Sequence, residues 1–133
     1  MADGYTIRVE PDFIYVVSSE PISLMSIQLF FALVPDEARN AGVSKVLCDM
    51  RGVTGQLDTL ERFQYGSRIA DKFQGLKTAF VLNESLIDPN RFGEKVAISR
   101  GGNIRVMTTL EEAYTWLGVK RKTGACLMSD SAA

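Results

Sequence analysis

Short strand-like segments alternate with longer helix-like segments along most of this sequence, and that alternation constrains the fold more than any other feature. The first two strand-like segments follow one another across the turn signal Pro11–Asp12, so we expect an antiparallel hairpin there. A helical pattern precedes each later strand, which favours parallel pairing with right-handed crossovers. We therefore predict an α/β fold with the order β-β-α-β-α-β-α-β-α and a mainly parallel central sheet flanked by helices. The predicted strands span residues 5–10, 13–17, 45–49, 78–82 and 104–107.

The first predicted helix carries an unusually wide apolar stripe. A helix on one face of a sheet needs only one apolar side. Three uses of the stripe stay open: burial under other elements, contact with a second copy of the chain, or the lining of an apolar cavity. We favour burial combined with a dimer contact. The candidate interface or cavity residues are Met25, Ile27, Phe30 and Phe31.

Pro35 interrupts the same apolar stretch. Proline lacks an N–H group and its ring clashes with the preceding turn, so it fits badly inside a helix. We therefore expect the first helix to end near Val34. A short second turn is predicted to start at Pro35 and to end at Gly42.

Capping signals predict where the other helices begin. Asp58 can accept hydrogen bonds from backbone N–H groups, and Glu61 three residues later completes a capping-box pattern. Asp88 and Pro89 predict the start of the next helix, with Asp88 as its cap. A second capping box at residues 109–112 begins the last one.

The helix that starts after Asp58 contains a glycine, Gly66. Glycine inside a helix costs up to about 1 kcal/mol relative to alanine, so we expect Gly66 to mark a close approach to the sheet. The predicted apolar face of this helix comprises Leu60, Phe63, Ile69, Ala70 and Phe73.

Length and composition fit one soluble domain. The chain has 133 residues, which we divide into a domain at 1–118 and a flexible C-terminal tail at 119–133. It has no histidine, which excludes Ser-His-Asp and Cys-His catalysis and histidine metal sites. The net charge of -1 gives no electrostatic footprint for nucleic acid. We expect no cofactor, no metal and no disulfide, and we place Cys48 in a buried strand.

The beginning of the chain lacks the basic and apolar regions of a signal peptide. The most apolar stretch, residues 22–34, is shorter than the roughly 20 residues that span a membrane. We therefore expect a cytoplasmic protein without a membrane span.

The most favourable place for a site lies beyond the carboxyl ends of the parallel strands, where α/β folds bind ligands. Asp49, Arg51 and Thr54 follow one predicted strand there, and Asp58 closes the loop. These carboxylates and the guanidinium could act on a substrate or bind a divalent cation. We prefer a structural role, in which Asp58 caps a helix and Arg51 pairs with Asp49. No nucleophile–base pair or cofactor motif is present, so we do not expect an enzyme.

Two segments resemble a known family. Residues 45–55, KVLCDMRGVTG, followed by Leu57, Asp58 and Thr59 at a helix start, resemble the third strand and following loop of SpoIIAA-like proteins of the STAS group, which includes anti-sigma-factor antagonists. Residues 104–117, IRVMTTLEEAYTWL, look like the last strand and helix of these proteins. The resemblance in element order covers residues 5–117. It implies a SpoIIAA-like fold, which is also similar to CRAL-TRIO lipid-transfer domains.

The resemblance also implies a candidate modification site. STAS antagonists carry a phosphorylatable Ser or Thr in an Asp-Ser-Ser-Gly-like loop at the helix after the third strand. Asp58 and Thr59 align with the Asp and the phosphoacceptor, whereas the second Ser and the Gly are absent. A phosphate on Thr59 would meet the free N–H groups and positive dipole of the first helical turn, and Arg62 could help to hold it. The alternative is an exposed Thr59 that is never modified.

Two functional hypotheses follow from the residues and the resemblance. The first is a non-enzymatic cytoplasmic binding or regulatory module that acts through protein–protein interaction as a homodimer. Its working surface would be the loop 49–59 and the first helix. The alternative is a carrier or sensor of a small apolar or lipid-like ligand bound between the first helix and the sheet.

Overall fold

A five-stranded sheet forms the centre of the computed structural model, which describes residues 5–19, 24–55, 58–84, 87 and 90–120. The strands lie in the order β1-β2-β3-β4-β5, the same order as in the chain. β1 pairs antiparallel with β2, and every later pair is parallel, as the sequence predicted. The strands are β1 (Tyr5–Val9), β2 (Ile14–Ser18), β3 (Lys45–Met50), β4 (Lys77–Leu82) and β5 (Asn103–Met107).

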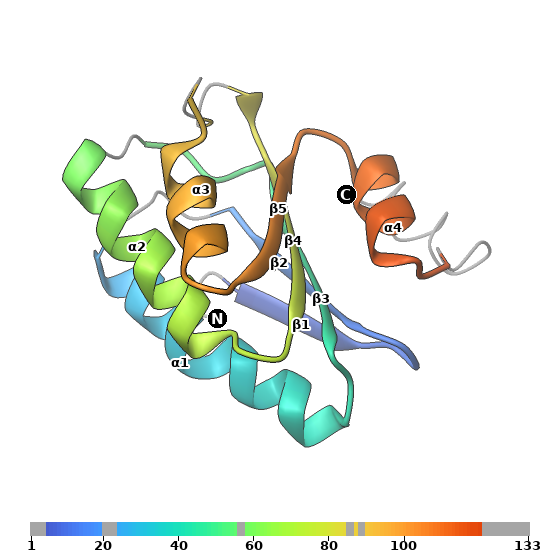
Figure 1. Cartoon of the computed structure of the whole chain (residues 1–133). Helices are drawn as coiled ribbons and strands as arrows, with labels where there is room; N and C mark the ends of the chain where they lie inside the picture. The colour runs from blue at the N-terminus through green and yellow to red at the C-terminus, as the bar shows by residue number, and fades with distance from the viewer. Residues whose placement is uncertain (1–4, 20–23, 56–57, 85–86, 88–89, 121–133) are drawn as a thin grey trace.

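The helices cover the two faces of the sheet unequally. α1, α2 and α3 lie on one face and α4 lies on the other (Figure 1). The cause is topological: right-handed crossovers between strands that follow one another in sheet order place every connecting helix on the same face. The helices are α1 (Leu24–Ala41), α2 (Thr59–Lys72), α3 (Phe92–Ser99) and α4 (Leu110–Leu117).

Each face of the sheet has its own apolar core. Because side chains alternate along a strand, β2 sends Ile14 and Val16 toward the three-helix layer and Tyr15 toward α4. The core of the three-helix layer also contains Phe30, Phe31, Val34, Val46, Cys48, Phe73 and Phe80. The core under α4 contains Phe13, Leu47, Ala79, Val81, Met107, Leu110, Tyr114, Leu117 and Val119.

α1 continues through Pro35 to Ala41, so the predicted end near Val34 is wrong. Val34 and Ala38, on either side of the proline, are fully buried in the three-helix core. Packing on both sides of Pro35 offsets the backbone hydrogen bond that a proline cannot make. Gly42 has a positive φ of 75° directly after the helix, in agreement with the predicted stop.

α3 begins at Phe92, later than the sequence predicted. Its N-terminal flanking residue is Arg91 in the left-handed conformation, with φ 51° and ψ 46°, and this side chain does not cap the helix. Asp88 and Pro89, the predicted cap and first helical residue, lie outside the described residues. The predicted tail also lies mostly outside them; of its first residues, Val119 is buried and Lys120 is exposed.

Gly66 marks a close approach, but to α3 rather than to the sheet. A Cβ atom placed on Gly66 would lie 2.5 Å from the carbonyl oxygen of Gly93 and 3.2 Å from the Cβ of Val96. α2 and α3 therefore touch backbone to backbone at this position. The sequence signalled the close approach, and the topology, with α2 and α3 side by side, determines the partner.

We predict that Gly66→Ala destabilises the fold, because its Cβ would overlap a backbone carbonyl that cannot move alone. The free energy of unfolding in urea should fall by about 1–3 kcal/mol. Gly93→Ala is the matched control, because its Cβ would meet nothing nearer than 3.4 Å and alanine favours helix. Equal stability of wild type and Gly66→Ala would contradict the backbone contact.

Candidate functional site

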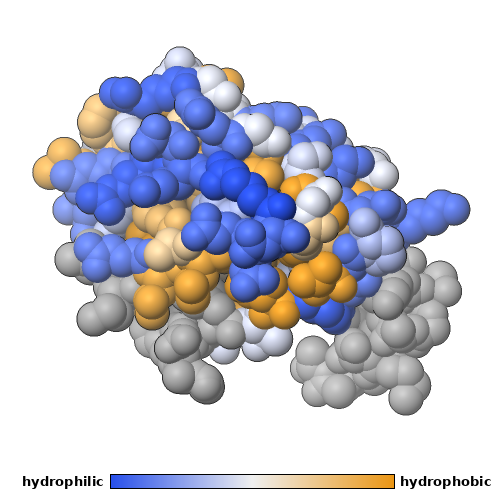
Figure 2. All heavy atoms as spheres, turned by 90° about the horizontal axis from the view of Figure 1, so that it is seen from below, coloured by the Kyte–Doolittle hydropathy of each residue, from blue (hydrophilic) through white to orange (hydrophobic). Residues whose placement is uncertain are grey.

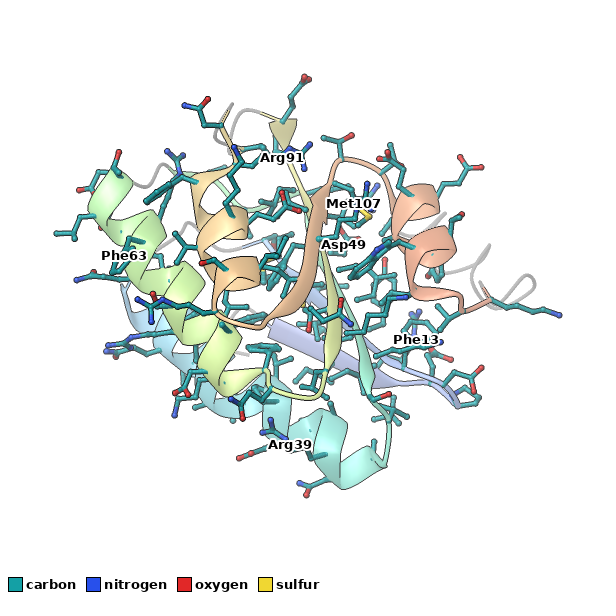
Figure 3. All side chains as sticks on the ribbon, viewed as in Figure 1. Phe13, Arg39, Asp49, Phe63, Arg91 and Met107 are labelled. Carbon is teal, nitrogen blue, oxygen red and sulfur yellow. The ribbon has the colours of Figure 1, made fainter. Side chains whose placement is uncertain are left out.

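Asp49 and Arg51, two of the predicted site residues, form an ion pair at the carboxyl end of β3. Arg51 donates from Nε to Oδ1 of Asp49 at 2.8 Å and from Nη2 to Oδ2 at 2.9 Å, a two-pronged contact. The hydroxyl of Tyr15 donates to Oδ2 at 3.0 Å. Asp49 lies in the same row of the sheet as Val81 and Met107, on the face that α4 covers (Figure 3).

The charges and hydrogen bonds of this cluster determine the protonation states of Asp49 and Tyr15. Burial alone would raise the pKa of the Asp49 carboxyl, but the hydrogen bonds and charge of Arg51 outweigh it and hold that pKa below its ordinary value. Burial, followed by the negative charge of Asp49, raises the pKa of the Tyr15 hydroxyl far above its ordinary value. At neutral pH Asp49 is therefore a charged acceptor and Tyr15 a neutral donor. The hydrogen bond between Tyr15 and Asp49 links β2 to β3. Because both protonation states are stable at neutral pH, the pair is not suited to proton transfer.

The loop after β3 folds back over the end of β2. The N–H of Val53 donates to the carbonyl of Met50 at 3.1 Å, which closes a turn, and the Val53 side chain is buried. A Cβ on Gly52 would lie 3.0 Å from the Cβ of Ser19, so the loop leaves little space at that position. Thr54, a predicted member of the site, is exposed farther along the loop.

Asp58 and Glu61 form the predicted capping box at the start of α2. The N–H of Glu61 donates to Asp58 Oδ1 at 2.7 Å, and the N–H of Asp58 donates to Glu61 Oε1 at 2.9 Å. Thr59 is the first helical residue and is exposed. Arg62 is partly buried, and its backbone lies against α3, with its carbonyl oxygen 3.4 Å from a Cβ placed on Gly93.

Leu60 and Phe63 point outward, so their predicted place on the buried face of α2 is wrong. Leu60 is 63% exposed and Phe63 is 39% exposed. The buried residues of α2 are Gly66 and Ala70, with Phe73 buried just beyond the helix end. The guanidinium of Arg100 lies 5.4 Å from the centre of the Phe63 ring. The sequence identifies the apolar residues of α2, but which of them reach solvent depends on how the helix packs in the folded chain.

The residues of the predicted apolar interface on α1 differ in how deeply they are buried. Phe30 and Phe31 are buried in the chain's own core, where the Phe30 ring lies 5.4 Å from that of Phe73 and 5.9 Å from that of Phe80. Ile27 is half-buried against the same core, and the side chain of Met25 lies outside the described residues. Leu33, another apolar residue of α1, is 41% exposed, so a second copy could still reach it.

Figure 2 shows the molecule from below, with several apolar patches among polar residues and the largest of them in the lower half of the view. The buried side chains of α1 pack directly against the sheet and α2. This packing does not favour the alternative hypothesis of a ligand carrier. A homodimer through α1 stays a prediction.

Two further findings concern the described part of the chain only. It contains no group of three or more histidine, cysteine, aspartate or glutamate side chains that could hold a metal ion. None of its helices combines the length and the apolar character that crossing a membrane requires.

We predict that Arg51→Gln destabilises the fold by about 1 kcal/mol at pH 7, a modest amount because Arg51 is half-exposed and water screens its charge. Asp49 has a folded pKa below its ordinary 3.8. The ion pair therefore stabilises the fold above about pH 4, and this contribution is lost as the pH falls through the folded value. Urea unfolding between pH 2 and pH 7 measures the effect.

The difference between wild type and Arg51→Gln should shrink as the pH falls through the folded pKa of Asp49, because the carboxylate then loses the negative charge that Arg51 binds. Arg105→Gln, at an exposed position on β5, is the control and should leave stability unchanged at either pH. A loss that is the same at both ends of the pH series would show that Arg51 acts through packing and not through its charge.

No protein-family model matches this chain, and no curated protein matches it. Several solved structures are similar to this chain. A variant of RsbS from Moorella thermoacetica has a TM-score of 0.53 at 15% identity, over 86% of this chain and 94% of that one. The unphosphorylated form of the anti-sigma factor antagonist SpoIIAA has a TM-score of 0.50 at 10% identity, over 88% and 99%.

The third structure is an uncharacterised protein with a SpoIIAA-like fold from Shewanella loihica, with a TM-score of 0.49 at 15% identity over 85% and 91% of the two chains. The expected similarity to CRAL-TRIO lipid-transfer domains is not borne out by these structures. The match to RsbS and SpoIIAA covers nearly their whole length, with the single α/β domain and mostly parallel sheet described above. The chain therefore has a SpoIIAA-like fold.

Proposed function

We propose that this chain is a non-enzymatic regulatory module of the cytoplasm that acts by binding another protein through the first two turns of α2. The observation that carries the proposal is the exposure of Leu60 and Phe63 on a helix whose other apolar residues are packed. Apolar side chains that a helix leaves in water next to one another are typical of a binding surface. Asp58, the exposed capping residue before the first turn, completes this surface.

The fold supports a regulatory role. One structure with this fold is described as an anti-sigma factor antagonist, a protein that works by controlling another protein. The residues at the carboxyl ends of the strands support binding over catalysis, because Arg51 and Tyr15 already occupy both oxygens of Asp49. A carboxylate held in this way is a poor general base.

Thr59 is the candidate control point of this surface. It is exposed beside Leu60, and the N–H groups of the first helical turn favour a phosphate there. The capping carboxylates of Asp58 and Glu61 lie on the same turn, so a phosphate would also bring new negative charge against two existing ones. Modification of Thr59 would thus change the charge of the surface next to its apolar residues.

We predict that Leu60→Asp and Phe63→Ala each abolish capture of the partner from extracts of the cells that produce this protein. Leu60→Asp should fold with a stability within about 0.5 kcal/mol of wild type, because the side chain is exposed. Affinity capture with quantitative mass spectrometry measures the loss. Val9→Asp is the matched control, since Val9 is an equally exposed apolar residue on β1, and it should capture the same protein as wild type. Unchanged capture by both α2 variants would refute the proposed surface.

A second prediction concerns the switch. Thr59→Glu should weaken binding of the captured partner at least tenfold, because it places a permanent negative charge beside Leu60. Thr59→Ala should bind like wild type, because it removes only an exposed hydroxyl. Titration calorimetry with the purified partner measures both affinities, and phosphopeptide mass spectrometry on protein from native cells tests the modification. If neither variant changes the affinity, Thr59 is not the switch.

A further inference from the structure

β5 is an edge strand with a groove along its outer side. It is the last strand in the sheet order and pairs with β4 on its inner side. A groove of about 870 Å³ runs along the opposite side and is lined by residues of α3, β5 and α4. In Figure 1 β5 lies at the boundary of the sheet between these two helices. A strand edge presents backbone N–H and C=O groups to whatever lies beside it.

Two side chains of the α3 turn bond to the backbone of this edge. The N–H of Val106 donates to Glu94 Oε2 at 2.8 Å. The carbonyl oxygen of Val106 accepts from Nη1 of Arg91, which lies between α3 and β5 (Figure 3). In a parallel sheet, the N–H and the carbonyl of a residue that faces away from one neighbouring strand both bond to the strand on its other side. A carboxylate acceptor and a guanidinium donor therefore occupy the places of a peptide carbonyl and a peptide N–H.

The arginine of this pair is held in an unfavourable backbone conformation. Arg91 is the one residue other than glycine with positive φ among the described residues, at φ 51° and ψ 46°. Left-handed backbone is disfavoured for a residue with a side chain as large as arginine. Arg91 also pairs with Glu94 at 3.5 Å, but its side chain is 43% exposed, so water screens that attraction. A peptide that replaced both contacts would leave the N–H and the carbonyl of Val106 fully bonded.

The walls of the groove define what such a peptide should carry. Side chains of an added strand would alternate between the α3 side and the α4 side. On the α3 side, Ile98 lines the groove and is 52% exposed, which suits an apolar residue. On the α4 side, the exposed carboxylates of Glu111 and Glu112 outnumber the guanidinium of Arg105, which suits a basic residue.

We propose that the outer edge of β5 is a docking site for an extended peptide segment with alternating apolar and basic residues, and that Arg91 and Glu94 hold this site closed. Docking adds a sixth strand to the sheet. The segment's carbonyl accepts from the N–H of Val106 in place of Glu94, and its N–H donates to the carbonyl of Val106 in place of Arg91. This surface is separate from the one proposed on α2 and does not rest on it.

The test uses a fluorescein-labelled heptapeptide of alternating valine and lysine, with binding to the full chain measured by fluorescence anisotropy. Glu94→Ala and Arg91→Gly should each bind it at least tenfold more tightly than wild type, because each removes one of the competing contacts. Arg91→Gly keeps the fold testable even if Glu94→Ala is unstable, because glycine adopts this backbone conformation without strain. Glu94→Gln should stay close to wild type, since its amide oxygen can still accept from Val106.

The controls separate strand addition from simple charge attraction. Lys95→Ala, on the same helix but outside the groove lining, should bind like wild type. A peptide N-methylated at every residue should not bind, because it has no backbone donors, and an alternating valine–glutamate peptide should bind at least tenfold more weakly. The proposal is overturned if the opened variants bind the peptide no better than wild type or if the N-methylated peptide binds equally well. Dimerisation of the opened variants alone in sedimentation velocity would also overturn it, by making a second copy the occupant.

Discussion

The backbone contact between α2 and α3 decides which side chains of this protein reach solvent. Gly66 must face Gly93, because any side chain at position 66 would overlap the α3 backbone. This requirement fixes the rotation of α2 about its axis, and Ala70 and Phe73 follow Gly66 into the core. Leu60 lies six residues before Gly66. At 100° per residue, its side chain points about 120° away from Gly66 around the helix axis, and so away from the core. The exposure of Leu60, on which the proposed function rests in part, is therefore a consequence of helix packing.

The other face of the sheet shows how a polar cluster can occupy the usual ligand position without being a reactive site. Asp49 sits where parallel sheets place their ligand-binding groups. Its two oxygens accept from Arg51 and Tyr15, and both contacts favour the charged carboxylate. The cluster stabilises the junction between β2 and β3, and its fixed protonation gives no group that exchanges protons near neutral pH. The surfaces proposed for binding lie elsewhere, on α2 and at the edge of β5.

Sequence reasoning succeeded where the determining interactions are local and failed where they are long-range. The capping box of Asp58 and Glu61 spans three residues and was predicted correctly. The strands and their directions followed from alternation and topology. The continuation of α1 through Pro35 depends on burial of Val34 and Ala38 against distant strands, so the local preference of proline gave the wrong end. The hydrogen bond from Tyr15 to Asp49 joins residues 34 positions apart, and Tyr15 stood in the sequence as one more member of an apolar run.

Residues 91–94 connect the two surfaces described above. Gly93 packs against α2 at Gly66 and Arg62, while Arg91, two residues before it, and Glu94, one residue after it, bond to β5. The turn cannot move toward solvent as a rigid unit without losing the α2 contact. Opening of the β5 edge must then come from rotation of the two side chains, with the backbone of the turn in place. The left-handed backbone of Arg91 belongs to the same turn, which places Gly93 against α2 and brings the side chains of Arg91 and Glu94 to β5.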